Sequence, residues 1–251
     1  MRRRIVAGNW KMNMDHEEGG ELAASVAKGL EGRRPGCEVV LIPPFTTLPA
    51  VAGAVRGSDI LTGAQDLWYE SGGAFTGEVS GVMLSRLGCT YVLVGHSERR
   101  HVIGEGPGLL AKKLRAALEA GLMPIFCVGE RLEEREEGRA SDVVVRQLGE
   151  VLQGLGAAGI DRTVIAYEPV WAIGTGKTAT PDDAEAMHGV IRKELASLFN
   201  EESAMRTSIL YGGSVKPGNA ASLLEMENID GALVGGASLE AESFLGIVFP
   251  D

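Results

Sequence analysis

The sequence predicts an α/β fold: a single domain, residues 1–251, in which eight parallel strands close into a barrel and a helix follows each strand. Three observations support this prediction. Short apolar segments recur about every 30 residues, patterns of helical period separate them, and the chain has the usual length of such a barrel. Barrels of this kind carry their functional residues at the carboxyl ends of the strands.

The apolar segments are rich in β-branched residues, as expected of strands buried on both faces. The expected strands are 4–8, 38–42, 60–63, 91–94, 123–128, 163–167, 208–211 and 231–234. The clearest expected helices are 17–30, 109–120, 143–155 and 184–199.

Composition excludes several classes of protein. The net charge of −10 argues against a surface for nucleic acid or an anionic membrane, so an anionic ligand would need a local positive site. No apolar run is long enough to cross a bilayer or to form a signal peptide. Cys37, Cys89 and Cys127 lie far apart and have no metal-binding spacing, so we expect reduced thiols and a cytoplasmic protein. Whether Cys127 stabilises the fold or is an oxidation target stays open.

Two strand ends carry residues that can act on a polar substrate. The first strand ends in Gly8-Asn-Trp-Lys-Met-Asn13, which places Lys11 as a cation at the mouth of the barrel. The fourth ends in Gly95-His-Ser-Glu-Arg-Arg100, at the start of a short helix. The positive end of that helix favours a neutral His96, which can donate an N–H to a carbonyl. Glu98 could pair with Lys11 across the mouth.

Glu168 directly follows the sixth expected strand, and a loop with apolar side chains comes next. Pro169 limits the backbone there, while Gly174 and Gly176 give the loop freedom. Thr180-Pro181 then begins a helix. A carboxylate beside a hinged apolar loop predicts a base that works in a dry site under a lid, residues 169–179. The alternative is a solvated glutamate before an ordinary connection.

Two segments of this loop resemble nucleotide-binding motifs. Residues 174–179 match the dinucleotide pattern GxGxxG/A, but the strand ends too early for a tight turn onto a helix. Gly176-Lys-Thr178 resembles the end of a P-loop, but position 171 is Trp where that motif needs glycine. We reject the P-loop. The dinucleotide site is a weak alternative, because no suitably spaced acidic residue follows.

Glycine pairs follow the last two expected strands, in Tyr211-Gly-Gly-Ser214 and in Val234-Gly-Gly-Ala237. The loops after strands seven and eight are where such barrels bind phosphate. Backbone amides of Gly213, Ser214, Gly235 and Gly236 could point at one dianion. The pairs therefore predict a phosphate site.

Residues 65–79 form a long connection that mixes glycine with Trp68, Tyr69 and Phe75. A loop of this length in a compact barrel is usually functional or disordered. Its aromatic residues favour a surface for a partner protein.

Taken together, these motifs resemble the triosephosphate isomerase family, in its order and over essentially the whole chain. Tyr167-Glu-Pro-Val-Trp-Ala-Ile-Gly-Thr-Gly-Lys177 is the most specific of them. The resemblance implies a (β/α)8 TIM barrel of glycolysis and gluconeogenesis that interconverts dihydroxyacetone phosphate and glyceraldehyde 3-phosphate. It implies neither a metal nor a cofactor.

The resemblance also implies roles for single residues. Glu168 would move the proton through an enediolate, His96 and Lys11 would act on the substrate oxygens, and Asn9 would position them. Gly174, Ser214, Gly235 and Gly236 would hold the phosphate. Tyr211 would latch the closed lid, and Glu130 would bind Trp171 in the open state.

The 65–79 loop resembles a segment that enters the neighbouring subunit of a homodimer, where Thr76 would approach the partner subunit's Asn9 and His96. One departure from the family pattern is Asp66, where an amide is more usual. Its negative charge puts details of the interface in question.

Two other functions are compatible with a phosphate-binding barrel. One is an aldolase with Lys11 as a Schiff base, although a nearby Glu98 favours a charged Lys11. The other is a non-catalytic barrel that binds phosphosugars. A placed base at Glu168, beside His96 and Lys11, favours the isomerase.

Overall fold

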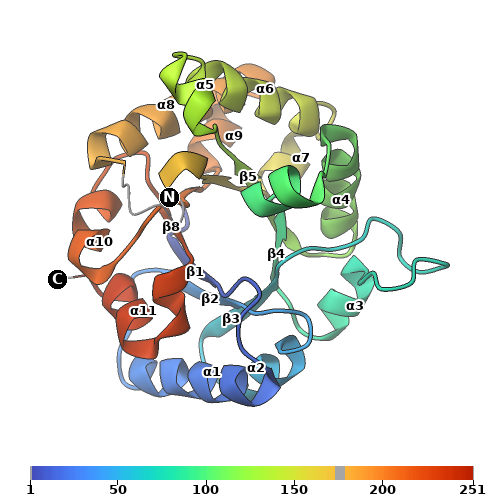
Figure 1. Cartoon of the computed structure of the whole chain (residues 1–251), viewed down its shortest axis with the longest axis vertical. Helices are drawn as coiled ribbons and strands as arrows, with labels where there is room; N and C mark the ends of the chain where they lie inside the picture. Colours follow the sequence, from blue (N-terminus) through green and yellow to red (C-terminus); the bar gives the residue numbers. More distant parts are fainter. Residues whose placement is uncertain (1, 173–178, 251) are drawn as a thin grey trace.

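The computed structural model describes residues 2–172 and 179–250, and it forms a ring of helices around an inner parallel barrel (Figure 1). The strands are β1 (Ile5–Asn9), β2 (Glu38–Ile42), β3 (Ile60–Ala64), β4 (Tyr91–Val94), β5 (Met123–Val128), β6 (Val164–Tyr167), β7 (Ile209–Tyr211) and β8 (Gly231–Val234). The predicted closed (β/α)8 barrel is confirmed, with strand bounds within a residue of those expected.

Each strand pairs with its neighbours in sequence order, and β8 pairs with β1 to close the barrel. In this register Ile5 lies opposite Glu38 of β2 on one side and Gly231 of β8 on the other. Gly231 is required there because a Cβ would lie 1.8 Å from the Ile5 carbonyl oxygen. Because the strands are parallel and the barrel is closed, all their carboxyl ends meet at one rim.

The outer layer consists of helices that run back between the strands. They are α1 (His16–Leu30), α2 (Leu48–Ala54), α3 (Gly81–Arg86), α4 (Pro107–Glu119), α5 (Leu132–Glu136), α6 (Ala140–Leu152), α7 (Ala157–Ile160), α8 (Pro181–Leu198), α9 (Glu201–Arg206), α10 (Pro217–Leu224) and α11 (Ala241–Val248). Short helical turns are η1 (Arg99–Ile103), η2 (Val170–Ala172) and η3 (Gly236–Leu239). The four clearest expected helices are confirmed. The others span too few turns to show a helical period.

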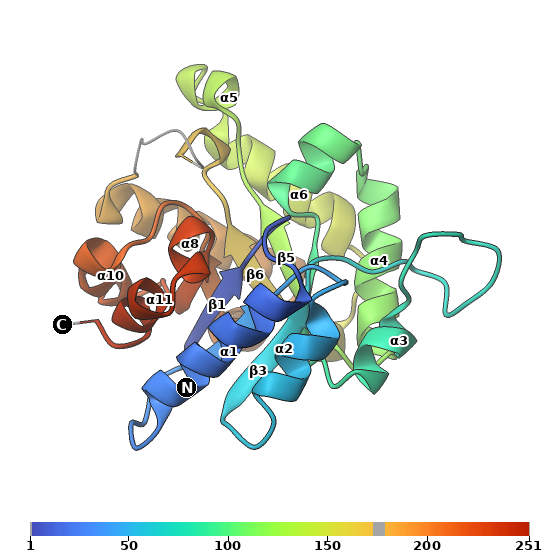
Figure 2. The same cartoon turned by 60° about the horizontal axis from the view of Figure 1, so that its bottom comes forward.

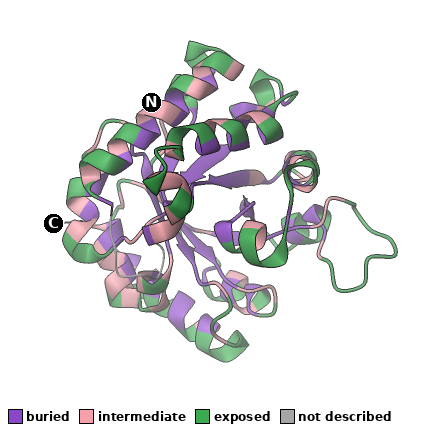
Figure 3. Cartoon of the chain, turned by 45° about the horizontal axis from the view of Figure 1, so that its top comes forward, coloured by how far each residue is buried: buried purple, intermediate pink, exposed green. Residues whose placement is uncertain are grey.

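The molecule has two apolar cores. One fills the interior of the barrel with inward side chains such as Ile5, Ala7 and Leu93. The other lies between the barrel and the helices and includes Val6, Trp10 and Phe244. Alternate residues of a strand point to opposite faces, so both faces of the sheet are buried, as Figure 3 shows. The two cores hold the strand ends in fixed positions.

The 65–79 loop extends away from the body between β3 and α3 (Figure 2). Residues 70–78 are exposed, and the backbone N–H of Trp68 donates to the carbonyl of Val79 at 2.8 Å across the root of the loop. No helix among the described residues is long and apolar enough to cross a membrane.

Candidate active site at the carboxyl ends of the strands

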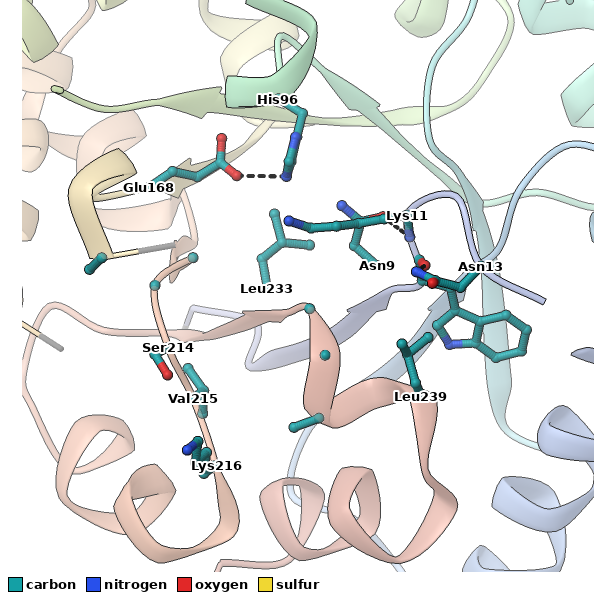
Figure 4. A pocket seen from close by; sticks show the side chains of 17 residues that line it. Asn9, Lys11, Asn13, His96, Glu168, Ser214, Val215, Lys216, Leu233 and Leu239 are labelled. Atoms are coloured by element: carbon teal, nitrogen blue, oxygen red, sulfur yellow. Dashed lines mark hydrogen bonds and ion pairs between the residues drawn. The ribbon is translucent and has the colours of Figure 1, made fainter. Parts of the chain in front are cut away.

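A cavity of about 380 Å3 opens at the carboxyl ends of the strands (Figure 4). A volume near 300 Å3 or more suits a small molecule. The cavity brings together residues from five strand ends that are distant in the sequence. Its lining includes Asn9, Lys11, Asn13, His96, Glu168, Gly212, Gly213, Ser214, Lys216, Gly235 and Gly236.

Glu168 lies at the inner wall of this cavity and is 2% exposed. One carboxylate oxygen, Oε1, lies 2.9 Å from Nε2 of His96. The other, Oε2, accepts the backbone N–H of Ser97 at 2.9 Å. Figure 4 shows the Glu168 and His96 side chains next to each other, joined by this contact. In this conformation one carboxylate oxygen contacts a side chain and the other a backbone amide, both from the adjacent residues His96 and Ser97.

The backbone around Glu168 requires a glycine on the adjacent strand end. A Cβ on Gly129 would lie 1.7 Å from the Glu168 carbonyl oxygen, which no rearrangement of side chains could relieve. The buried side chain of Gln147 on α6 fixes Gly129, because it accepts the Gly129 N–H at 2.8 Å and donates to its carbonyl at 3.0 Å. Gly129 and Gln147 were not among the predicted residues, since neither belongs to a strand-end motif with reactive groups.

The pKa of Glu168 has opposing influences. Burial raises it, whereas the charge and hydrogen bond of His96 and the Ser97 amide lower it, and the net direction is below the ordinary value. Burial lowers the pKa of His96, while the Glu168 carboxylate raises it, and the net direction in this conformation is upward. The helix end alone favours a neutral His96, whereas the Glu168 carboxylate, which comes from a distant strand end, opposes it.

The tautomer of His96 follows from its second nitrogen. Nδ1 lies 3.3 Å from the backbone N of Glu98, which donates to it. Nδ1 must then carry a lone pair, so the proton of a neutral ring lies on Nε2, the nitrogen that faces Glu168 and the cavity. A neutral His96 therefore presents an N–H donor to the cavity.

Lys11 has an unusual backbone conformation, with φ of 52°, which is unfavourable for a residue other than glycine. Three contacts stabilise it. Its N–H donates to Oδ1 of Asn9 at 3.0 Å, its carbonyl accepts from Gln65 Nε2 at 2.7 Å, and its Nζ lies 2.7 Å from Oε1 of Glu98. The pairing with Glu98 is as predicted. Gln65 was missed, because an amide in a loop root has no distinctive sequence signal.

The glycine pairs expose backbone donors to the cavity. Within the described chain, the amides of Gly213, Ser214, Gly235 and Gly236 donate to no protein acceptor. Gly213 also leaves space for a neighbour, since a Cβ there would lie 2.2 Å from the Tyr211 hydroxyl. These unpaired amides, with Lys11 and Lys216 on the same cavity, form the local positive site that an acidic protein needs for an anion.

The described part of the predicted lid includes residues 169–172, with Trp171 on η2. Its Nε1 donates to Oε1 of Glu130 at 2.8 Å, and the Tyr167 hydroxyl donates to the same oxygen at 3.1 Å. The Arg135 guanidinium lies 4.4 Å from the centre of the Trp171 ring. Gly174 and the rest of residues 173–178 lie outside the described residues. Beyond them, Thr180 caps α8 through a reciprocal contact with Asp183.

Tyr211 and Cys127 are both buried beside the cavity. Burial raises the pKa of Tyr211 to about 12, and the nearby Ala179 backbone lowers it, but the hydroxyl forms no hydrogen bond with a described residue. Cys127 lines the inner core, and burial raises the pKa of its thiol well above the ordinary value. A buried neutral thiol is a poor nucleophile, which favours a packing role for Cys127.

The structure does not bring Thr76 to the cavity of its own chain, since this residue is exposed on the projecting loop. Asp66, by contrast, is buried at the root of the loop and is compensated by Lys113 and Arg99. Among the described residues, no cluster of three or more His, Cys, Asp or Glu side chains could hold a metal ion.

Comparison with known proteins identifies the same family as the motifs. The sequence model of the family described as triosephosphate isomerase matches residues 4–249. Triosephosphate isomerase of Rhodopirellula baltica is 52% identical over 247 residues, which cover 98% of this chain and 97% of the relative. The enzymes of Roseiflexus sp. and Moorella thermoacetica are 54% and 53% identical, each over 99% of this chain and over 97% and 98% of their own lengths. The chain belongs to the triosephosphate isomerase family.

Proposed function

We propose that this protein interconverts dihydroxyacetone phosphate and glyceraldehyde 3-phosphate, with Glu168 as the base that moves the proton between adjacent carbons. The observation that carries the proposal is the cavity itself. It combines a buried carboxylate, an imidazole N–H donor, a cation and unpaired backbone amides around a volume suited to a triose phosphate.

The phosphate binds to the amides of Ser214, Gly235 and Gly236, and the sequence resemblance adds Gly174 of the lid. Backbone amides suit a dianion because they carry no charge that must be neutralised when the site is empty. The phosphate is remote from the reacting carbons, so its binding energy is available to close the lid and to exclude water.

With the phosphate bound there, the substrate carbonyl faces His96 and Lys11. Nε2–H of His96 and Nζ of Lys11 stabilise negative charge as it develops on the substrate oxygens, and Asn9 helps to position them. Glu168 takes the proton from the carbon next to the carbonyl to form an enediolate, and it returns the proton to the adjacent carbon.

Glu168 must leave the Ser97 amide and His96 to reach the substrate. This movement removes both hydrogen bonds that lower its pKa, while burial under the closed lid persists. A desolvated carboxylate without those donors is a stronger base. The same movement removes the carboxylate that raises the pKa of His96, which favours the neutral ring.

The lid, residues 169–179, moves between two sets of partners. The Trp171–Glu130 hydrogen bond and the Arg135 contact stabilise the open position at one hinge. Tyr211 latches the closed lid at the other hinge, and its buried hydroxyl has spare hydrogen-bonding capacity for this purpose.

The functional unit is a homodimer in which the 65–79 loop enters the second subunit, and Thr76 approaches the partner subunit's Asn9 and His96. Support comes from large apolar side chains that are exposed in one chain, including Val102 at 79% and Ile103 at 63%. The three free thiols support a reducing compartment, the cytoplasm.

The test is turnover of glyceraldehyde 3-phosphate in deuterium oxide, followed by NMR of the product. A proton carried by Glu168 exchanges with solvent, so we expect deuterium on the carbon next to the carbonyl. Borohydride should not trap a substrate adduct on Lys11. Binding of phosphosugars without turnover would instead identify a non-catalytic barrel, and a trapped adduct would identify an aldolase.

A further inference from the structure

A buried cluster of four charged side chains lies outside the cavity, at the root of the 65–79 loop. Nζ of Lys113 on α4 lies 2.7 Å from both carboxylate oxygens of Asp66 and 2.6 Å from Oε1 of Glu105. The Arg99 guanidinium lies 2.9 Å from Asp66 and 2.8 Å from Glu105. Asp66 follows β3, Arg99 begins η1, Glu105 lies in the short connection between η1 and α4, and Lys113 belongs to α4.

The cluster contains two carboxylates and two cations, so its formal charge is zero. Asp66 and Glu105 are each 4% exposed at the side chain and Lys113 is 1% exposed, while Arg99 is partly exposed at 31%. An unpaired charge in such surroundings is strongly unfavourable. Each carboxylate therefore needs a cation. Of the two cations in the cluster, Lys113 is fully buried and Arg99 is not.

Charged side chains near both ends of the loop act on the cluster. Asp66 is the second residue of the loop, and Glu78 near its other end adds negative charge close to Arg99. The Trp68 ring lies 5.9 Å from the Lys113 ammonium, and the Trp68 N–H closes the loop root onto Val79. The loop root is thus bound to α4 and η1 by side-chain contacts, and its two ends are joined to each other by a backbone hydrogen bond.

The cluster also reaches the turn that carries His96. The backbone N–H of Arg99 donates to the His96 carbonyl at 2.8 Å, so the side chain that binds Asp66 belongs to the same turn as the proposed catalytic imidazole. A shift of the loop root would be transmitted to His96 across this single turn.

An amide at position 66 would change this arrangement. Its one oxygen could not accept from Lys113 on both sides, and its NH2 group would face cations. The cluster would then carry a net positive charge. Asp66 thus matches the other three side chains electrostatically.

We propose that Asp66 is a positioning residue, which holds the root of the 65–79 loop against the His96 turn through its buried cluster with Lys113, Arg99 and Glu105. The part of this inference that concerns catalysis rests on the proposed function. Asp66 contacts no substrate and acts only through its neighbours.

A double-mutant cycle tests the proposal, with Asp66→Asn, Lys113→Met and the double variant in the full-length protein. Lys113→Met leaves two buried carboxylates with one partly exposed cation, so we expect its Tm to fall by roughly 6–20 °C. Adding Asp66→Asn restores neutrality and should recover part of this loss. We expect kcat/KM well below Tm to fall roughly 2- to 30-fold in each single variant, and the double variant to lose less than the product of the two single losses.

The control is Glu202→Gln with Arg206→Met, an exposed pair at i and i+4, for which we expect no measurable coupling. If Lys113→Met does not fold, folding of the double variant is the supporting result. Additive losses of Tm, or failure of both to fold, would overturn the cluster as a unit. Recovery of Tm without any change in kcat/KM or in the NMR signals of His96 would overturn the positioning role. Wild-type protein that shows no turnover would reject the proposed function, yet the Tm cycle would still report on the cluster.

Discussion

Two buried carboxylates lie at opposite ends of the barrel and differ in what surrounds them. Asp230, just before β8 at the amino end, accepts from Arg2 at 2.6 Å, from Arg192 at 3.0 Å and from the Ile209 amide at 2.9 Å. Glu168, at the carboxyl end of β6, has an imidazole and one amide as its direct partners. Both are almost inaccessible to solvent, at 5% and 2% exposed.

The two carboxylates differ in whether they can exchange their hydrogen-bond partners. Two guanidinium groups hold the Asp230 side chain in a single geometry, so it can contribute only to stability. Glu168 has partners that can be exchanged, and it faces a cavity with unpaired donors. Burial of a charged group therefore does not identify an active site, whereas burial beside a cavity with replaceable partners does.

The largest expected effect concerns Glu168. Glu168→Gln keeps the volume and the amide contact but removes the base, so kcat should fall by about 10³- to 10⁴-fold. Affinity for a phosphate-bearing substrate analogue should change little, since the phosphate donors are elsewhere. A coupled assay and calorimetric titration measure both quantities. A variant with nearly normal kcat would mean that another group moves the proton.

The matching change at the other end of the barrel is Asp230→Asn. It leaves Arg192 without its anion, so the free energy of unfolding should fall by about 3–5 kcal/mol. Turnover at 20 °C should stay within about twofold, because this end of the barrel has no contact with the cavity. Denaturant unfolding and the coupled assay test the pair of expectations. A loss of kcat without a loss of stability would contradict the contrast between the two ends.

The pH dependence of activity should reveal the partners of Glu168. Its pKa in the free protein lies below the ordinary value of 4.5, because His96 and the Ser97 amide outweigh burial. The ionised carboxylate therefore contributes stability above the unfolded-state pKa, and this contribution is lost as pH falls through the folded-state pKa.

The acid limb of kcat/KM should accordingly lie below pH 4.5. His96→Gln removes the main opposing influence and leaves burial in place, so the limb should move to higher pH. The same variant should lower kcat by about 10²- to 10³-fold, as expected for one oxyanion donor. A limb that stays in place would show that His96 does not set this pKa.

The smallest expected effect concerns Gly36, and Gly129 provides the comparison. Gly36, near the amino end, has no neighbour within 4 Å of an added Cβ, so Gly36→Ala should stabilise the protein by about 0.4–1 kcal/mol. Gly129→Ala, beside Glu168, should destabilise it because of the clash with the Glu168 carbonyl. Thermal unfolding of both variants checks the signs. Equal effects at the two positions would show that the strand end near Glu168 can relax.

Local patterns in the sequence were sufficient for the barrel and for many of the residues that line its cavity. Strand period, helix caps such as Thr180-Pro181 and the glycine pairs act over a few neighbouring residues, so they can be read without knowledge of the fold. The rule that strand ends meet at one rim then predicted that residues 9, 11, 96, 168 and 214 share a cavity, and the structure brings them together.

Contacts between residues that are far apart in the sequence could be identified only in the folded structure. Gln147 fixes Gly129, Gln65 supports the strained Lys11, and Lys113 compensates Asp66, yet each pair is 18 residues or more apart and its members lie on different elements. Nothing in the local sequence around an amide or a lysine specifies which distant group it will meet. The charge state of His96 depends likewise on a carboxylate 72 positions away. Long-range packing decides such partners, because the hydrogen-bonding and charge needs of a buried group are met by whichever side chains the fold places beside it.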